Sequence, residues 1–254
     1  MSPLIAAQFL TRVPIPGIPA YAMRDVARAQ AWFPAVGLLL GLALLAVDRL
    51  AMRALPGATV DVLLVVAMVA LTGALHLEGL ADAADGLFGG DSPPRRLEIM
   101  RDVHAGSYAI IGVAAVLALK WAGLNALPPN ARVEAIVLAP CLARFGLLVA
   151  IAAFPYARAE GLGAGFREAL WPAQFMVGSA VTLIASIALL GAGGLPTVAF
   201  VAAIALVIGA YVSSLVGGMT GDTYGAVVEV CEALVLLFIA ALANRGWMDA
   251  WAFG

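Results

Sequence analysis

The segment HLEGLADAADGLFGG, residues 76–90, carries three carboxylates and no basic residue directly after a strongly apolar run. Asp82 follows Glu78 by four residues and Asp85 follows Asp82 by three, so one face of a helix would hold all three. Like charges at this spacing repel one another, and near a bilayer each also loses hydration. A divalent cation would offset both costs, and oxygen ligands suit Mg²⁺. These acids therefore predict a metal site, the alternative being a solvated acidic helix end.

A second group of residues that could act on phosphate follows in RRLEIMRDVHAGSY. Glu98 and Asp102 are four residues apart, with Arg101 and His104 beside them. Phosphoryl transfer needs acids for a metal or a general base next to arginines that hold phosphate oxygens. An amphipathic surface helix with i,i+4 pairs would show the same pattern. The other histidine, His76, heads the acidic segment and fits either a base or a structural hydrogen bond.

A third acidic stripe lies in GGMTGDTYGAVVEVCEALVLLF, where Glu229 follows Asp222 by seven residues and Glu232 follows three later. Carboxylates within a membrane span mark function or pair with a buried cation. For the deeper Glu232 we expect a structural pair with Arg144 or Lys120, the basic residues inside the apolar runs. Asp222 lies in a glycine-flanked segment before the span, and we expect it to contribute to the functional site.

The composition indicates what class of protein holds these groups in place. Of 254 residues, 63% are hydrophobic and 12% are charged, and the mean hydropathy is +1.01. Soluble domains are about 45–50% apolar and about 25% charged, so the chain is predicted to be a membrane protein. A net charge of −2 gives no basic surplus for nucleic acid. The two cysteines fall in apolar runs and are expected to be free thiols.

The expected fold is a single all-α polytopic bundle of about seven transmembrane helices, because backbone groups in lipid must be satisfied within helices. A helix of about 20 apolar residues crosses the membrane. Seven stretches qualify: 31–52, 60–77, 108–124, 133–154, 175–193, 197–216 and 225–243. The long polar segment 78–107 is expected as a motif loop on the cytoplasmic side.

Arginines predict the orientation through the excess of basic residues in cytoplasmic segments. If the N-terminus is cytoplasmic, four arginines face outward: Arg49, Arg53, Arg132 and Arg245. Eight then face inward: Arg12, Arg24, Arg28, Arg95, Arg96, Arg101, Arg158 and Arg167. Every segment with candidate chemistry then faces the cytoplasm, which predicts a cytoplasmic-membrane enzyme with an inward-facing site.

These motifs together resemble the cobalamin synthase (adenosylcobinamide-GDP ribazoletransferase) family over almost the whole chain. The acidic segment is similar to the family pattern His-x-Asp-Gly-x-Ala-Asp-x-x-Asp-Gly, with Glu78 in place of the first aspartate. After Asp102 the family reads Ser-Arg-Ile-Gly, whereas this chain has His104 in place of that arginine. The other similar segments are FLTRVPIP (9–16), WFPAVGLLLG (32–41), RRLEIMRD (95–102), FPYARAEGLG (154–163) and GGMTGDTYGA (217–226).

The resemblance implies that adenosylcobinamide-GDP reacts with α-ribazole or its 5′-phosphate, releasing GMP and forming adenosylcobalamin or its 5′-phosphate. It implies Mg²⁺ held by Glu78, Asp82 and Asp85, with Asp102 and His76 as candidate catalytic groups. Candidate contacts to substrate phosphates are Arg12, Arg101, His104, Arg158 and Asp222. The expected partners are these two substrates and the lipid membrane. A homo-oligomer or association with other cobalamin-assembly enzymes is left open.

Two other functions are compatible with parts of the sequence. Asp82-Ala-Ala-Asp85-Gly86 resembles the first half of the CDP-alcohol phosphotransferase signature, although its Ala-Arg continuation is absent from this chain. A cation-coupled transporter would use Glu229, Glu232 and Arg144 as a relay, although transporters commonly show two related halves and none is visible here. Interfacial acids favour an enzyme, and acids at mid-membrane favour a carrier.

Overall fold

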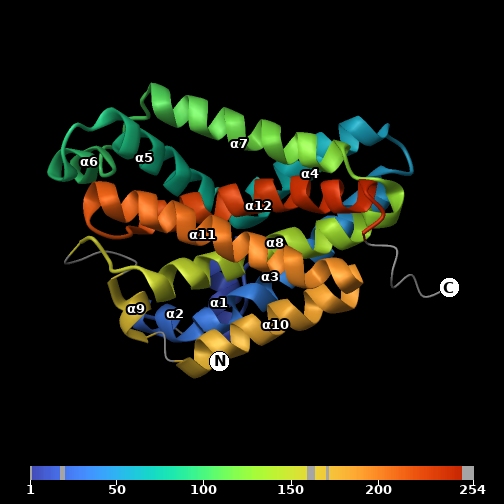
Figure 1. The fold of residues 1–254 in the computed structure, drawn as a ribbon, viewed down its shortest axis with the longest axis horizontal. Helices are drawn as coiled ribbons and strands as arrows, with labels where there is room; N and C mark the ends of the chain where they lie inside the picture. Colours follow the sequence, from blue (N-terminus) through green and yellow to red (C-terminus); the bar gives the residue numbers. More distant parts are fainter. Residues whose placement is uncertain (1, 18–20, 159–163, 170–171, 248–254) are drawn as a thin grey trace.

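The computed structural model describes residues 2–17, 21–158, 164–169 and 172–247, and their regular structure is helical (Figure 1). Among these residues, the strand-like pairing is one isolated bridge between Tyr156 and Met219. The helices in chain order are α1 (Ser2–Leu10), α2 (Met23–Ala29), η1 (Gln30–Trp32), α3 (Phe33–Ala51), α4 (Gly57–Thr72), α5 (Leu75–Gly89), α6 (Pro93–Ile99), α7 (Ser107–Asn125), α8 (Pro129–Ala153), α9 (Ala164–Ala169), α10 (Pro172–Leu190), η2 (Gly191–Gly193), α11 (Gly194–Val216) and α12 (Gly221–Asn244).

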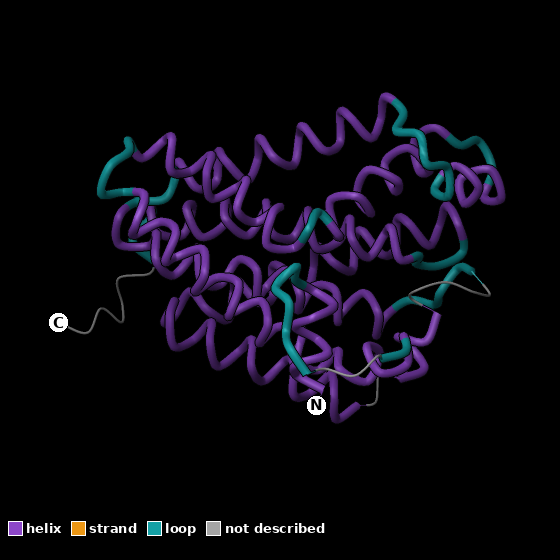
Figure 2. The backbone as a smooth tube through the Cα atoms, turned by 180° about the vertical axis from the view of Figure 1, so that it is seen from behind, coloured by secondary structure: helices purple, strands orange, loops and turns teal. Residues whose placement is uncertain are grey.

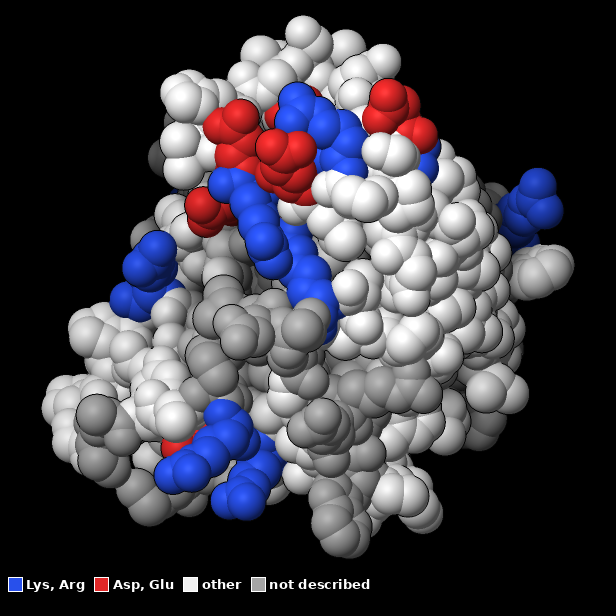
Figure 3. Space-filling model, turned by 90° about the vertical axis from the view of Figure 1, so that its left-hand side faces the viewer, with Lys and Arg blue, Asp and Glu red and all other residues white. Residues whose placement is uncertain are grey.

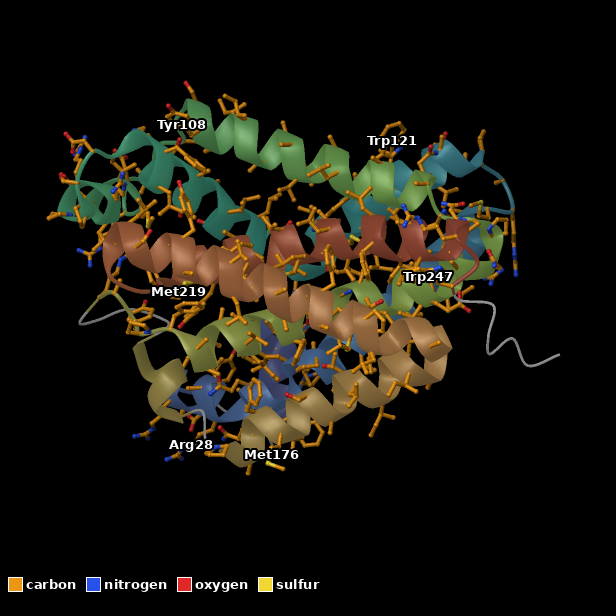
Figure 4. The ribbon with its side chains drawn as sticks, in the orientation of Figure 1. Arg28, Tyr108, Trp121, Met176, Met219 and Trp247 are labelled. Carbon is orange, nitrogen blue, oxygen red and sulfur yellow. The ribbon has the colours of Figure 1, made fainter. Side chains whose placement is uncertain are left out.

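Helix α8 forms the centre of the bundle and is flanked by α3, α12, α11 and α10 (Figure 1). Its most apolar window is 94% buried, whereas that of α7 is 28% buried, as expected for a helix that faces lipid. Connecting segments gather mainly at the two ends of the long helices (Figure 2). Figure 4 marks Tyr108 and Trp121 toward opposite ends of α7, and both are exposed, as interfacial aromatic residues usually are.

Within the described residues, five helical stretches are long and apolar enough to cross a membrane, or six with the bent pair α4 and α5. One of the five, Pro172–Val216, consists of α10 and α11, which lie side by side and run in opposite directions (Figure 1). The chain is therefore an all-helical multi-pass membrane protein, which confirms the fold class predicted from composition.

A bend of 93° separates α4 from α5. Gly73 and Ala74 both adopt left-handed backbone angles, with φ of 62° and 60°, so the chain stops one helix and starts another in a new direction. For Ala74 this conformation costs about 1–2 kcal/mol, which the surrounding packing must offset. The span predicted at 60–77 consequently ends at Thr72, where the bend begins.

The segment predicted as a loop, 78–107, contains the rest of α5, all of α6 and the first residue of α7. Helix α5 is buried along the face formed by Gly79, Leu80, Ala83 and Ala84, which packs against α12 and α7. Small residues on this face allow the neighbouring backbones to approach, and this close packing stabilises a helix despite its acidic residues. The motif is thus part of the helical bundle.

A buried ion cluster connects α7, α8 and α12. Lys120 Nζ lies 2.7 Å from a carboxylate oxygen of Glu229 and 2.5 Å from one of Glu232. The second oxygen of Glu232 accepts a 2.9 Å hydrogen bond from Arg144. All four side chains are buried, and their two positive and two negative charges balance. The structural pairing predicted for Glu232 is therefore confirmed, with Lys120 and Arg144 both as partners.

A second ion cluster ties α3, α4 and α8 together at the other end of the bundle. Arg132 contacts Asp48 and Asp61 at 2.7 Å each. Both aspartates are buried, and Asn125 of α7 donates a 3.3 Å hydrogen bond to Asp61. These ion pairs hold together the helix ends that lie far from the acidic motif. They do not involve the carboxylates of that motif.

Candidate active site

The acidic face of α5 meets the start of α12 at a crossing of two glycines. A β-carbon on Gly79 would lie 2.9 Å from the backbone oxygen of Asp222, and one on Gly225 would lie 2.8 Å from that of His76. Side chains at either glycine would force the helices apart. The crossing therefore brings Glu78 and Asp82, on either side of Gly79 in sequence, next to Asp222.

Arg158 reaches the same place through paired backbone segments. The N–H of Met219 donates to Pro155, and the N–H of Ala157 donates to Met219, both at 2.8 Å. Met219, labelled in Figure 4, lies toward the end of the molecule at which α12 begins. The pairing places Arg158, the next residue, against α12, where its guanidinium lies 3.0 Å from Asp222. Arg158 Nε is buried and has no hydrogen-bond partner within the described part of the chain.

These groups line one cavity of about 370 Å³. Its polar wall carries three carboxylates and one guanidinium, while aromatic and small residues form much of the remainder. The lining residues are Phe9, Leu75, His76, Glu78, Gly79, Asp82, Leu147, Tyr156, Arg158, Phe166, Gly221, Asp222, Tyr224 and Gly225. The structure therefore brings together five of the predicted site residues: His76, Glu78, Asp82, Arg158 and Asp222.

The polar wall has an unbalanced negative charge. Asp82 is repelled by Asp222, Glu78 and Asp85, and Arg158 is the cation that attracts it. Three carboxylates from two helices form the all-oxygen donor set that suits Mg²⁺. The donor chemistry fits this ion, although among the described residues no three Asp, Glu, His or Cys side chains already converge on one point. Asp222 is instead paired with Arg158, so its release would have to accompany binding of a cation.

His76 joins the cavity to the buried ion cluster. Its side chain lines the cavity, is 5% exposed, and interacts electrostatically with Arg144, Glu232 and Lys120. Its Nδ1 is buried without a hydrogen-bond partner in the described residues. A buried polar atom of this kind normally has a partner. A substrate group in the cavity would supply one.

Asp85 is placed away from the cavity, at the beginning of α7. One of its carboxylate oxygens accepts a hydrogen bond from the N–H of Gly106, and the other accepts from Ala109 at 2.8 Å. An anion at this position satisfies N–H groups that lack partners in the first turn and interacts favourably with the helix dipole. Asp85, predicted as a metal ligand, therefore acts as a cap for α7 in this structure.

Asp102, Arg101 and His104 lie in the exposed turn between α6 and α7 and do not line the cavity. Figure 3 views this end of the molecule and shows acidic and basic side chains gathered there. Asp102 accepts hydrogen bonds from the His104 backbone at 3.0 Å and lies 2.7 Å from its Nδ1. The hydrogen bond to the His104 side chain lowers the pKa of Asp102, which makes this carboxylate a weaker base.

Arg12, predicted to contact phosphate, lies in the turn after α1 and is exposed. Its N–H donates a 2.8 Å hydrogen bond to Leu71, and its side chain covers Gly73 at the bend between α4 and α5. The structure therefore places it at the bend and not in the cavity lining. Residues 159–163, the second half of the motif 154–163, lie outside the described residues.

The aromatic residues of the cavity were not predicted as site residues, although Phe9, Tyr156 and Tyr224 lie in the motif segments 9–16, 154–163 and 217–226. Tyr156 and Phe166 are ten residues apart, whereas Phe9 and Tyr224 are far from them in the chain, and no regular spacing connects the four. A signal did exist for the helix crossing, because Gly79 and Gly225 are small residues beside the acidic groups, and small residues let helix backbones approach closely.

Comparison with known proteins assigns the chain to a family. A family model described as cobalamin-5-phosphate synthase matches residues 2–240. An adenosylcobinamide-GDP ribazoletransferase of Roseiflexus sp. is 39% identical over 91% of this chain and 86% of its own length. Those of Geotalea daltonii and Stutzerimonas stutzeri are 35% and 39% identical, each over 95% of this chain and 97% and 98% of their own lengths. No solved structure matches the chain. The resemblance predicted from the motifs is confirmed, and the chain belongs to the cobalamin-5-phosphate synthase family.

Proposed function

We propose that this protein joins adenosylcobinamide-GDP to α-ribazole or its 5′-phosphate, releasing GMP and forming adenosylcobalamin or its 5′-phosphate. The names of its relatives supply the substrates. The observation that carries the proposal in this structure is the cavity where Glu78, Asp82 and Asp222 face Arg158. Carboxylates beside a guanidinium are what a diphosphate substrate with its counter-ion requires.

Within this cavity, Arg158 is the proposed ligand of the diphosphate. A guanidinium donates in a planar fork that matches phosphate oxygens, and the Nε of Arg158 is a buried donor without a partner in the described residues. Its present partner, Asp222, is an anion that a phosphate would replace. Binding of phosphate therefore releases Asp222 toward Glu78 and Asp82.

Mg²⁺ is the proposed cofactor, held by Glu78 and Asp82 together with Asp222. When bound, it would neutralise the charge that develops on the departing phosphate. Three carboxylates from two helices fit this ion by their chemistry. Asp85 was expected in this set, and its hydrogen bonds to the first turn of α7 favour a positioning role for it instead.

The proposed reaction is one displacement at phosphorus. The ribazole hydroxyl attacks the phosphate on the cobinamide side, a new P–O bond forms, and the bond to the bridging oxygen breaks. GMP leaves with that oxygen and its electron pair. The proton of the hydroxyl passes to a cavity carboxylate, and Arg158 holds the phosphate oxygens in line. His76 binds a substrate group through a hydrogen bond, because its buried Nδ1 is without a partner in the described residues.

We further propose that the site faces the cytoplasm from the cytoplasmic membrane. Six arginines lie on the segments around the end that bears the cavity: Arg24, Arg28, Arg95, Arg96, Arg101 and Arg158. Four lie at the other end: Arg49, Arg53, Arg132 and Arg245. The excess of basic residues at the first end supports a cytoplasmic location for it. Both proposed substrates are large and polar, which agrees with entry from water.

The test is GMP release by the purified protein given adenosylcobinamide-GDP and α-ribazole 5′-phosphate, with EDTA or Mg²⁺. We expect metal-dependent release of GMP with formation of a cobamide. Asp82→Asn should reduce kcat/KM by about 100-fold or more, a loss typical of removing one electrostatic contact to the transition state. Asp91→Asn, the same change at an exposed position outside the cavity, is the matched control. Release that persists at full rate in EDTA, or in Asp82→Asn, would contradict the metal site.

A further inference from the structure

One wall of the cavity is a continuous series of aromatic rings. The Phe9 and Phe166 rings lie edge to face with centroids 6.2 Å apart, and Phe166 lies 6.5 Å from Tyr224. Tyr224 is stacked with Tyr156 at 6.3 Å and 29° between ring planes. All four residues line the cavity. We call this set the aromatic wall.

The outer members of the aromatic wall can receive a ligand. Phe166 and Tyr224 are 5% and 3% exposed and serve mainly to hold the wall together. Phe9 and Tyr156, at its two ends, are half-buried and retain accessible ring surface. A different element positions each ring: Phe9 lies on α1, and Tyr156 lies in the segment paired with Met219. A rigid, partly accessible ring of this kind can stack on another planar ring.

The position of this wall relative to the charged groups points to a nucleoside. Arg158 is separated by one residue from Tyr156, and Asp222 by one residue from Tyr224, so both pairs link the aromatic and charged walls. A phosphate held by Arg158 would place the attached ribose and base within the same cavity. We propose that the aromatic wall is a subsite that stacks the planar bicyclic base of a nucleotide whose phosphate contacts Arg158.

The volume of the cavity supports a subsite of this size. About 370 Å³ is near the lower end of the roughly 300–1,000 Å³ typical of small-molecule pockets. That space suits one nucleotide, and the corrin ring of adenosylcobinamide-GDP would have to remain outside it. This inference rests on the proposed function. Two nucleotides of that reaction carry a bicyclic base, the guanosine part and the ribazole part, and binding of each alone tells them apart.

The experiment measures binding and needs no turnover. Full-length protein in detergent or nanodiscs is titrated calorimetrically with α-ribazole 5′-phosphate, with GMP, and with inorganic pyrophosphate as a probe without a base. The variants are Tyr156→Leu, which removes a ring, and Tyr156→Phe, which keeps it. Tyr211→Leu, at an exposed aromatic residue of α11 that does not line the cavity, is the matched control.

We expect Tyr156→Leu to raise the Kd of one of the two nucleotides by about 5-fold or more, as for loss of one base-stacking ring. Tyr156→Phe and Tyr211→Leu should remain within about 2-fold of the parent, and pyrophosphate binding should be unchanged. The nucleotide that weakens identifies the base that occupies the wall. Unchanged binding of both nucleotides would overturn the subsite, as would an equal loss for pyrophosphate, which indicates general damage. Failure of the proposed reaction would appear separately, as absence of GMP release from a protein that binds nucleotide.

Discussion

The buried ion cluster beneath the cavity allows a sharp test of the structure, through Glu232→Gln. Glu232 contacts Lys120 through one oxygen and Arg144 through the other, and all three side chains are buried. The substitution keeps the shape and removes one negative charge. Two buried cations then remain with one carboxylate, that of Glu229. Glu229 contacts Lys120, so Arg144 is left without its ion-pair partner.

The expected loss follows from the charge that is left unpaired. Removing one partner of a buried ion pair costs about 3–5 kcal/mol, and at roughly 2–4 °C per kcal/mol the unfolding midpoint should fall by roughly 6–20 °C. The exposed pair Arg95–Glu98 provides the comparison, because water screens an exposed ion pair and Glu98→Gln should leave the unfolding midpoint nearly unchanged. The same chemical change at Glu232 and at Glu98 should therefore shift the unfolding midpoint by very different amounts.

The assay is thermal unfolding of the purified protein, followed by circular dichroism in one detergent. A compensated variant sharpens it: Lys120→Met with Glu229→Gln removes one charge of each sign and leaves the Arg144–Glu232 pair intact. This double variant should be more stable than Lys120→Met alone, because no unpaired charge remains. If Glu232→Gln shifts the midpoint no more than Glu98→Gln, or the double variant loses the sum of its two single losses, the proposed energetics of the cluster are refuted.

Three further predictions concern the site and its support. Asp85→Ala should destabilise the protein by about 1–3 kcal/mol in thermal unfolding, because it leaves two N–H groups at the start of α7 without a hydrogen bond. The same variant should bind Mn²⁺ as the parent does, as measured by electron paramagnetic resonance. Loss of Mn²⁺ binding would show that Asp85 is a metal ligand. Gly225→Leu should abolish nucleotide binding because the side chain would meet the His76 backbone, while Gly57→Leu, outside the cavity and with its nearest neighbour atom at 3.7 Å, should bind nucleotide normally. Asp102→Asn should release GMP within about threefold of the parent rate, since Asp102 lies outside the cavity, and a loss of about 100-fold would restore it as a base.

The sequence alone determined the membrane class, the helical fold and the family. Composition suffices for the first two, because lipid permits few ways to satisfy a backbone. The acidic spacing of Glu78 and Asp82 and the glycine-flanked Asp222 also identified the polar wall of the cavity in advance. These residues were found because charges that are costly near a membrane stand out in an apolar chain.

Which of these residues meet depends on how the helices pack against one another. Asp85 shares the predicted helical face with Asp82, yet the packing of α7 on α5 takes both of its oxygens as a cap. Asp102 was predicted to act on phosphate because of its spacing from Glu98 and its neighbouring arginine, but it lies in an exposed turn. Arg158 reaches Asp222 through backbone pairing across 64 positions of the chain, and the aromatic wall is assembled from four segments. Periodicity reports the face of one helix, whereas contacts between distant segments depend on how close each pair of backbones can approach.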